Sequence, residues 1–169
     1  MYQHESDVAS LAESFTEMSE ILMPDDTNNL GRALGGAILH WMDICAAISA
    51  RRFARRQVVT AAMDHVDFKR PIELGDVVVV TGYVFDTGGS SMDVKVEVRS
   101  ERPAEGTYEQ TATSYFTMVA LDDDGDSTAV PDLVCETEME EALHETAVER
   151  RRDRRAALAI DYQSEETAP

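Results

Sequence analysis

The clearest pattern in the chain is a run of apolar residues at helical spacing between Gly35 and Ala50. The recurring apolar positions are Leu34, Ile38, Trp41 or Met42, Cys45 and Ile48. This spacing follows the 3.6-residue period of an α-helix. Alanine fills much of the remaining helix surface, so we expect one long helix that is buried nearly all round.

Several later segments have the pattern of β-strands instead. They are Val58 to Phe68, Asp76 to Phe85, Met92 to Val98 and Thr107 to Leu121. The second contains four consecutive valines, which is typical of a central strand. The third alternates between apolar and charged residues. A looser alternation from Phe15 to Met23 predicts one more strand ahead of the helix.

The order of these elements predicts a single α+β domain. One strand, one long helix and four antiparallel strands match the hot-dog fold, in which an antiparallel β-sheet wraps around one buried helix. Pro131 precedes an extra, charged C-terminal helix over about 136–159. We expect the domain to span residues 13–160, with a flexible N-terminus over 1–12 and a disordered tail over 161–169.

The chain is strongly acidic. It has 33 Asp and Glu against 15 Lys and Arg, a formal net charge of −18, and 13 of the bases are Arg. Such a surface repels nucleic acid and anionic lipid, so neither is an expected partner. Salt relieves the self-repulsion, since the Debye length falls to about 3 Å at 1 M. The scarcity of Lys favours adaptation to a salt-rich cytoplasm over an ordinary acidic protein.

Composition also limits the expected location and cofactors. No apolar run approaches the roughly 20 residues that span a bilayer, and the N-terminus lacks the pattern of a secretory signal. Cys45 and Cys135 form neither a metal-site spacing nor a disulfide framework, which fits a reducing cytoplasm. The acidic loop over 122–126 resembles a calcium loop only superficially. We therefore expect a cytoplasmic protein with no bound metal.

The segment that leads into the long helix carries the candidate chemistry. It places Asp26, Asn28, Gly31, the pair Gly35-Gly36 and Asp43 at fixed spacings. A charge within a helix that is otherwise fit to be buried is costly unless it pairs with another group or performs a function. Asp43 is therefore the residue that most needs an explanation.

On these residues the chain resembles the hot-dog acyl-CoA thioesterases, in the branch of the cytosolic, brain-type long-chain acyl-CoA hydrolases and their bacterial relatives. The family pattern is Asp-x-Asn-x-x-Gly, then Gly-Gly, then an acid seven positions later. Further matches lie at Val59–Ala61, Asp64–Phe68, Ile72, Gly75, Thr81–Gly82, Thr87–Met92, Phe116–Thr117 and Val130–Pro131. The similarity covers about residues 14–150. Leu34 departs from the pattern, since several members have His there, and register with Gly31 selects Asn28 rather than Asn29.

The resemblance implies hydrolysis of fatty acyl-CoA to a free fatty acid and CoA, without a cofactor. Gly36 would offer its backbone N–H, at the positive end of the helix, to the thioester carbonyl. Asp43 would act as a general base toward water, or as a nucleophile that forms a mixed anhydride. Asn28 would hold the water or the thioester through its amide.

Each of these residues also has a purely structural interpretation. A glycine pair packs a helix against a sheet, an aspartate is satisfied by neighbouring backbone, and an asparagine caps a turn. If Asn29 caps the turn, Asn28 stays available for the substrate. His40 and His65 accompany no serine nucleophile, and we interpret both as packing residues or as residues that support the site without contacting the substrate.

The CoA part of the substrate needs contacts of its own. By resemblance, these come from the turn at Thr87, Gly88, Gly89, Ser90 and Ser91, from Thr60 along the pantetheine arm, and from Gly35 at the helix start. Arginines suit phosphate groups, and they cluster at 51–56 and 150–155. We select Arg154 as a CoA contact. The alternatives are interaction with the helix dipole and pairing with Glu145 or Glu149.

By the same resemblance the site lies between two subunits, with Asn28 of one facing Asp43 of the other. A strand-by-strand dimer would also pair an exposed sheet edge, and trimers of such dimers predict a homohexamer. Two other functions stay open. One is a non-catalytic acyl-CoA-binding protein. The other is an enoyl-CoA hydratase or dehydratase, which usually needs a histidine with an acid.

Overall fold

The computed structural model describes residues 8–165, with side chains up to residue 157. The elements in chain order are β1 (Val8–Ser10), α1 (Leu11–Ser14), β2 (Thr16–Ile21), a 3₁₀ turn (Pro24–Asp26), α2 (Gly35–Ala54), β3 (Gln57–Met63), β4 (Asp67–Phe68), β5 (Val77–Thr87), β6 (Ser91–Arg102), β7 (Thr107–Leu121), β8 (Asp132–Val134) and α3 (Glu138–Glu165). No helix in this range is long and apolar enough to cross a membrane.

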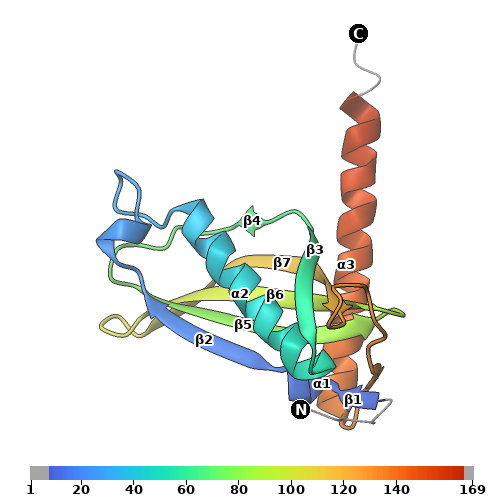
Figure 1. Ribbon diagram of the computed structural model, residues 1–169. Coiled ribbons are helices and arrows are strands. Elements are labelled where there is room, and N and C mark those ends of the chain that lie inside the picture. The colour runs from blue at the N-terminus through green and yellow to red at the C-terminus, as the bar shows by residue number, and fades with distance from the viewer. Residues whose placement is uncertain (1–7, 166–169) are drawn as a thin grey trace.

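The main sheet has six antiparallel strands and curls around α2 (Figure 1). Its order is β2-β5-β6-β7-β3, with the short β4 also paired to β7. Strand β3 therefore forms one outer edge of the sheet. This arrangement of one long helix in a curled antiparallel sheet confirms the predicted hot-dog fold.

The principal core fills the space between α2 and the concave face of the sheet. Met92, Val94, Val96 and Val98 of β6 are fully buried against it, which confirms the alternation predicted for this strand. In β5, Val78, Val79 and Val80 are all buried, as expected for a strand covered on both faces. The alternation in β6 thus predicts which face of that strand meets the helix.

Gly82 on β5 lies in close contact with side chains of α2. A Cβ at this position would lie 3.0 Å from Cys45 Sγ and 3.1 Å from Ser49 Oγ. Both distances are shorter than ordinary van der Waals contact, so a larger residue would push the helix away. The glycine that packs α2 onto the sheet is therefore Gly82.

Helix α3 covers part of the opposite face of the sheet and then continues beyond the body of the domain (Figure 1). A second apolar cluster lies beneath it, including Tyr83, Phe85 and Tyr115. Arg151 of α3 is buried there and donates to Asp64 at 3.2 Å, and it also pairs with Asp93. These contacts anchor the C-terminal helix.

The predicted boundaries differ from the structure at several places. Helix α2 extends to Ala54 and is not buried all round, because His40 is exposed and Ile44 and Ile48 are half-buried. The predicted strand over 58–68 is divided into β3 and β4. Its outer position leaves β3 exposed along most of its length.

The ends of the chain differ as well. Residues 8–12 of the predicted flexible N-terminus belong to β1 and α1, and β1 pairs in parallel with β8. Sequence patterns did not predict β8, which is three residues long. Helix α3 reaches Glu165, past its predicted end near residue 159 and into the predicted disordered tail. The rest of the predicted flexible N-terminus and disordered tail, residues 1–7 and 166–169, lies outside the described residues.

Candidate active site

The turn that precedes α2 is organised by Asn28. Its Oδ1 accepts hydrogen bonds from the backbone N–H groups of Leu30 at 2.9 Å and Arg32 at 3.2 Å. Asn28 therefore caps this turn itself, as its structural interpretation expects, and the alternative in which Asn29 takes that role is not found. Because the carbonyl oxygen is used in this way, the amide Nδ2 remains as a donor for another group.

A pocket of about 340 Å³ lies beside this turn. Asn28 and Gly35 line it together with the apolar side chains of Ile38, Phe68 and Ile72. The structure thus brings two of the predicted site residues to one cavity. Arg32, Lys69 and Arg70 also line it, so the cavity combines apolar surface with polar and charged groups, as small-molecule sites usually do.

Helix α2 begins at this pocket with unpaired backbone donors. Leu34 is the N-cap without a side-chain cap, and its carbonyl accepts from Ala37 at 3.1 Å and Ile38 at 3.2 Å. The N–H groups of Gly35 and Gly36 have no hydrogen-bond partner among the described residues, as is usual in a first helical turn. They point out at the positive end of the helix dipole.

The glycine pair is not required for packing within the chain. A Cβ on Gly36 would meet no atom within 4 Å, and one on Gly35 would meet only Phe68, at 3.8 Å. The interpretation that this pair packs α2 against the sheet is therefore wrong. The close contact that such an interpretation needs occurs at Gly82 instead.

Asp43 lies farther along α2, half-buried, and is held by one side chain of β3. Thr60 Oγ1 donates to Asp43 Oδ1 at 2.6 Å. The resemblance places Thr60 along the pantetheine arm, but no local spacing links it to Asp43, so the sequence does not predict this contact. Asp43 Oδ2 has no hydrogen-bond partner among the described residues. Thr60 therefore orients the carboxylate, and one of its oxygens is left to accept a hydrogen bond from another group.

Within one chain the two parts of the predicted site are separate. Asp43 does not line the pocket that holds Asn28 and Gly35. Asp43 comes seven positions after Gly36, which is about 10 Å along the helix axis at 1.5 Å per residue. No described contact joins Asn28 to Asp43. A single chain therefore presents the amide and helix start in one place and the carboxylate in another.

Hydrogen bonds to other parts of the same chain stabilise the turn between β5 and β6. Gly88 N–H donates to the carbonyl of Ser91 at 2.8 Å, and a Cβ on Gly88 would lie 2.6 Å from Ser91 Oγ. The carbonyls of Gly89 and Ser90 accept from later backbone N–H groups, and Thr87 Oγ1 accepts from a backbone N–H of β8. No described hydrogen bond links this turn to Asn28 or the start of α2.

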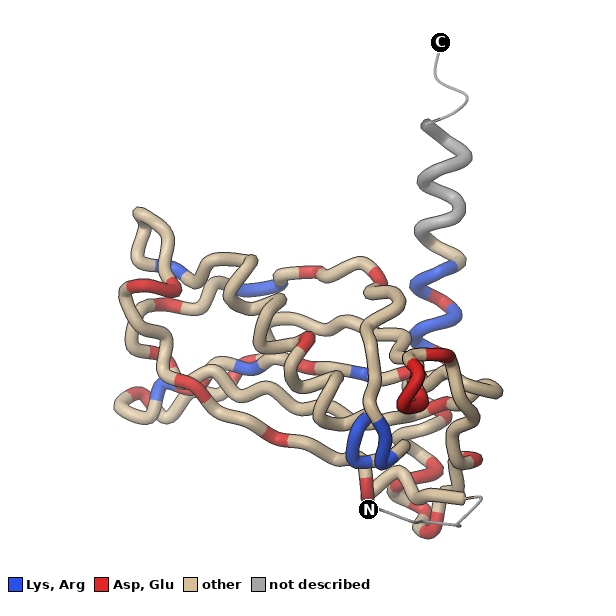
Figure 2. The backbone as a smooth tube through the Cα atoms, viewed as in Figure 1, with Lys and Arg blue, Asp and Glu red and all other residues tan. Residues whose placement is uncertain are grey.

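Basic residues gather at the end of α2 and on α3, whereas acidic residues are spread over the remainder (Figure 2). In the first group, Arg52 donates to Phe15 O at 2.6 Å and Arg55 pairs with Glu13 at 2.7 Å, so both hold the chain near α1. Two cations of the first cluster thus have structural partners.

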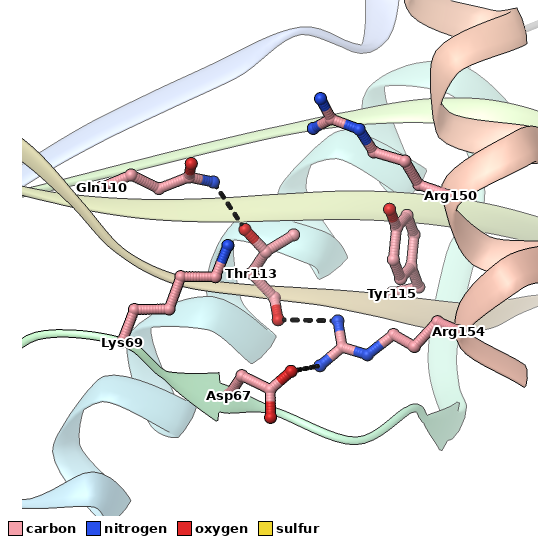
Figure 3. Close-up of a pocket in the computed structure, with 7 residues that line it drawn as sticks. All are labelled: Asp67, Lys69, Gln110, Thr113, Tyr115, Arg150 and Arg154. Atoms are coloured by element: carbon pink, nitrogen blue, oxygen red, sulfur yellow. Dashed lines mark hydrogen bonds and ion pairs between the residues drawn. The ribbon is translucent and has the colours of Figure 1, made fainter. Parts of the chain in front are cut away.

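Arg154 in the second cluster does not pair along its own helix with Glu145 or Glu149. It donates instead to Thr113 O at 3.1 Å and to Asp67 Oδ2 at 3.2 Å. It lines a second pocket with Lys69 and Arg150 (Figure 3). Sequence spacing grouped Arg150 with Arg154 but gave no signal for Lys69, which comes from the segment after β4.

The surroundings of Cys45 and His65 bear on whether a thiol nucleophile, a histidine base or a metal ion could take part in the reaction. Burial raises the pKa of the Cys45 thiol to about 12, which keeps it protonated and unreactive near neutrality. His65 Nε2 lies 2.8 Å from Asp67 Oδ1 on the surface. Among the described residues, no group of three or more His, Cys, Asp or Glu is placed to hold a metal ion.

Comparison with known proteins gives concordant matches. The family model of the thioesterase superfamily matches residues 30–107. An uncharacterised acyl-CoA thioester hydrolase of Bacillus subtilis, YkhA, is 46% identical over 134 residues, 79% of this chain and 78% of the relative. A solved hexameric acyl-CoA thioesterase superposes with a TM-score of 0.81 at 38% identity, and the match covers 90% of this chain and 98% of that one.

A further solved structure is that of an acyl-CoA hydrolase from Staphylococcus aureus in complex with butyryl coenzyme A, coenzyme A and coenzyme A disulfide. It has a TM-score of 0.80 and 36% identity, and the match covers 94% of this chain and 97% of that one. Structures of the same enzyme include alanine variants of the asparagine, aspartate and threonine numbered 28, 43 and 60 in it. These matches show that the present chain belongs to the acyl-CoA thioester hydrolases of the thioesterase superfamily.

Proposed function

We propose that this acyl-CoA thioesterase hydrolyses fatty acyl-CoA at a site that two subunits share. Asn28 and the start of α2 come from one subunit, and Asp43 comes from its partner. The observation that carries the proposal is the separation of these groups within one chain, each with a hydrogen-bonding atom left unused. A second copy of the chain would bring the two halves together.

The first half of the site polarises the thioester. The N–H of Gly36 donates to the carbonyl oxygen, and the absence of a Cβ lets the substrate approach the backbone. The helix dipole favours the negative charge that develops on this oxygen. One such donor is typically worth about 2.7–4 kcal/mol of barrier. Asn28 Nδ2, left free because Oδ1 caps the turn, holds the attacking water or the thioester.

The second half activates the nucleophile. Asp43 takes a proton from a water molecule, the hydroxide oxygen attacks the thioester carbon, and the tetrahedral intermediate collapses with loss of the CoA thiolate, which is then protonated. In the alternative route Asp43 itself attacks and forms a mixed anhydride that water splits. Mass spectrometry of enzyme quenched during turnover distinguishes the routes, because only the second adds the acyl mass to Asp43.

Thr60 has a supporting role in both routes. Its hydroxyl holds Asp43 Oδ1 at 2.6 Å and so leaves Oδ2 to face the substrate. The three numbered variants of the Staphylococcus aureus enzyme concern an asparagine, an aspartate and a threonine. The present chain has the same residue types at these three numbers, which supports a shared site.

Assembly follows from surfaces that a single chain leaves uncovered. The outer edge of β3 and the half-buried residues Ile44 and Ile48 of α2 are suited to a second copy. We propose a dimer as the active unit and three dimers as the complete homohexamer, in line with the hexameric thioesterase reported above. The free cysteines, Cys45 and Cys135, fit a cytoplasmic location.

A test of the proposed chemistry compares Asp43→Asn with a matched variant elsewhere. Asp123→Asn removes the same charge from an exposed loop and serves as the control. We expect kcat for CoA thiol release to fall about 10²–10⁴-fold in Asp43→Asn and to stay unchanged in the control. The assays are run at molar salt, where self-repulsion is screened. Near-wild-type turnover by Asp43→Asn would overturn the assignment.

A further inference from the structure

Helix α2 begins without the features that usually stabilise the start of a helix. Its N-cap is Leu34, which provides no side-chain cap, and its first turn contains no acidic residue. Leucine is among the poorest N-cap residues, and acidic side chains near a helix N-terminus are favourable because of the helix dipole. The chain has 33 Asp and Glu, yet none of them lies in this turn. The start of α2 therefore lacks stabilisation that the composition of the chain could provide.

The other described α-helices begin with such stabilisation. At the start of α3, Thr137 Oγ1 accepts from the N–H of Glu140 at 3.2 Å, and Glu140 Oε2 accepts from the N–H of Thr137 at 3.2 Å. At the start of α1, the N–H of Ser10 donates to Glu13 Oε1 at 3.1 Å. Both arrangements are capping boxes. Of the three α-helices in residues 8–165, α2 alone begins without one.

Backbone hydrogen bonds to other segments hold the start of α2 in place of a cap. The N–H of Leu34 donates to Asp26 O at 2.8 Å. The N–H of Ala33 donates to Ile72 O at 2.9 Å. The path of the chain into the helix is thus fixed, although no side chain is printed as accepting from the first-turn N–H groups.

A capping side chain would compete for the donor that the proposed reaction uses. An N-cap oxygen accepts from the second or third residue of the helix, which are Gly36 and Ala37 here. The N–H of Ala37 already donates to Leu34 O at 3.1 Å, whereas that of Gly36 has no partner among the described residues. Gly36 is also exposed, so its N–H is accessible in the single chain. A capping oxygen at position 34 would therefore occupy the N–H of Gly36.

We propose that Leu34 is a positioning residue for thioester hydrolysis, because its inability to cap α2 leaves the N–H of Gly36 free for the thioester oxygen. This inference rests on the function proposed above, in which Gly36 donates to that oxygen. The absence of acids from the same turn acts in the same direction, since a carboxylate there would repel the negative charge that develops on the oxygen. The accompanying cost is a less stable helix start, as is common where a stabilising group would obstruct function.

The test compares Leu34→Ser with Leu34→Ala in the whole protein at molar salt. Both variants remove a side chain that is 42% exposed, but only serine can accept from the N–H of Gly36. Relative to Leu34→Ala, we expect Leu34→Ser to have a Tm higher by about 2–4 °C. We also expect its kcat/KM for acyl-CoA to be about fivefold lower, the factor that corresponds to about 1 kcal/mol for one cap. Equal kcat/KM values, or a Tm and a kcat/KM that change in the same direction as a purely structural role requires, would overturn the proposal.

Amide hydrogen exchange gives a readout that does not depend on turnover. The peptide that contains Gly36 should exchange more slowly in Leu34→Ser than in Leu34→Ala, because the cap protects this N–H. Equal exchange in the two variants would contradict the proposed competition. If the wild type hydrolyses acyl-CoA while the two variants have equal kcat/KM, only the role of Leu34 is rejected. If the wild type hydrolyses no acyl-CoA, the proposed function is rejected and the role of Leu34 with it.

Discussion

The hydrogen bond from Thr60 to Asp43 offers a sharp test of how the carboxylate is positioned. Thr60→Val removes the hydroxyl that donates to Asp43 Oδ1 at 2.6 Å. Valine keeps the branched shape and the β-strand preference of threonine, so the change should leave β3 intact. Thr60→Ser retains the donor and is the conservative control.

The expected size of the effect follows from the charge of the acceptor and the exposure of the donor. A hydrogen bond to a charged group is worth about 1.5–3 kcal/mol. Thr60 is exposed and Asp43 is half-buried in the single chain, which favours the lower end of that range. Since 1.4 kcal/mol corresponds to a factor of about ten, we expect kcat to fall roughly tenfold.

The assay is CoA thiol release over a series of acyl-CoA concentrations. Because Thr60 acts on Asp43 in this account, the loss should fall on kcat while KM changes little. Thr60→Ser should recover most of the activity. The reasoning would be refuted by unchanged kcat in Thr60→Val, or by a pure rise in KM that would place Thr60 against the substrate instead.

Three further predictions concern the frame that carries the site. Gly82→Ala places a Cβ 3.0 Å from Cys45 Sγ, so we expect about 1–3 kcal/mol of destabilisation and a lower Tm. The control is Gly89→Ala, whose Cβ meets nothing within 4 Å and which should leave Tm unchanged. Arg151→Gln removes the buried partner of Asp64 and Asp93 and leaves Asp64 only the exposed Arg155 at 3.6 Å, so it should cost about 1–3 kcal/mol, measured by urea unfolding; an unchanged midpoint would show that α3 is anchored otherwise. Burial raises the pKa of Cys45 to about 12, so iodoacetamide at pH 8 should alkylate it only after unfolding, and rapid native labelling would contradict its burial.

Hydrophobic periodicity was sufficient to predict the frame of the fold. The alternation in β6 identifies the strand and the face that packs against the helix, whereas the valine run in β5 identifies a strand that is covered on both faces. Short elements gave no such signal. The three residues of β8 pair with β1 across more than 120 positions of sequence, and local patterns contain no information about that pairing.

The same limit applies to the site. The spacing from Asn28 to Asp43 identified candidate site residues correctly as members of one turn and one helix. This was possible because both are local features of the sequence. It did not predict that Asn28 would cap the turn and still keep a free donor. The Thr60–Asp43 bond and the approach of Lys69 to Arg154 join distant segments, so they required the folded chain.

The burial expected for α2 was wrong for a physical reason that bears on function. Its apolar residues are sufficient to bury the whole helix, but one sheet covers only one side of it. The remaining half-buried residues, Ile44 and Ile48, lie on the same helix as Asp43. This apolar surface lies near Asp43, whose Oδ2 has no hydrogen-bond partner among the described residues, and both features favour contact with a second subunit on this side of α2.

The central claim, that two subunits share the active site, is tested most directly by subunit complementation. Asn28→Ala and Asp43→Ala are each expected to be inactive. In mixed dimers of the two variants, one of the two sites regains Asn28 from one subunit and Asp43 from the other. Random pairing should therefore restore about one quarter of wild-type activity, because half of the dimers are mixed and each contains one intact site. Activity no greater than that of the separate variants, in samples shown to contain mixed dimers, would contradict the account.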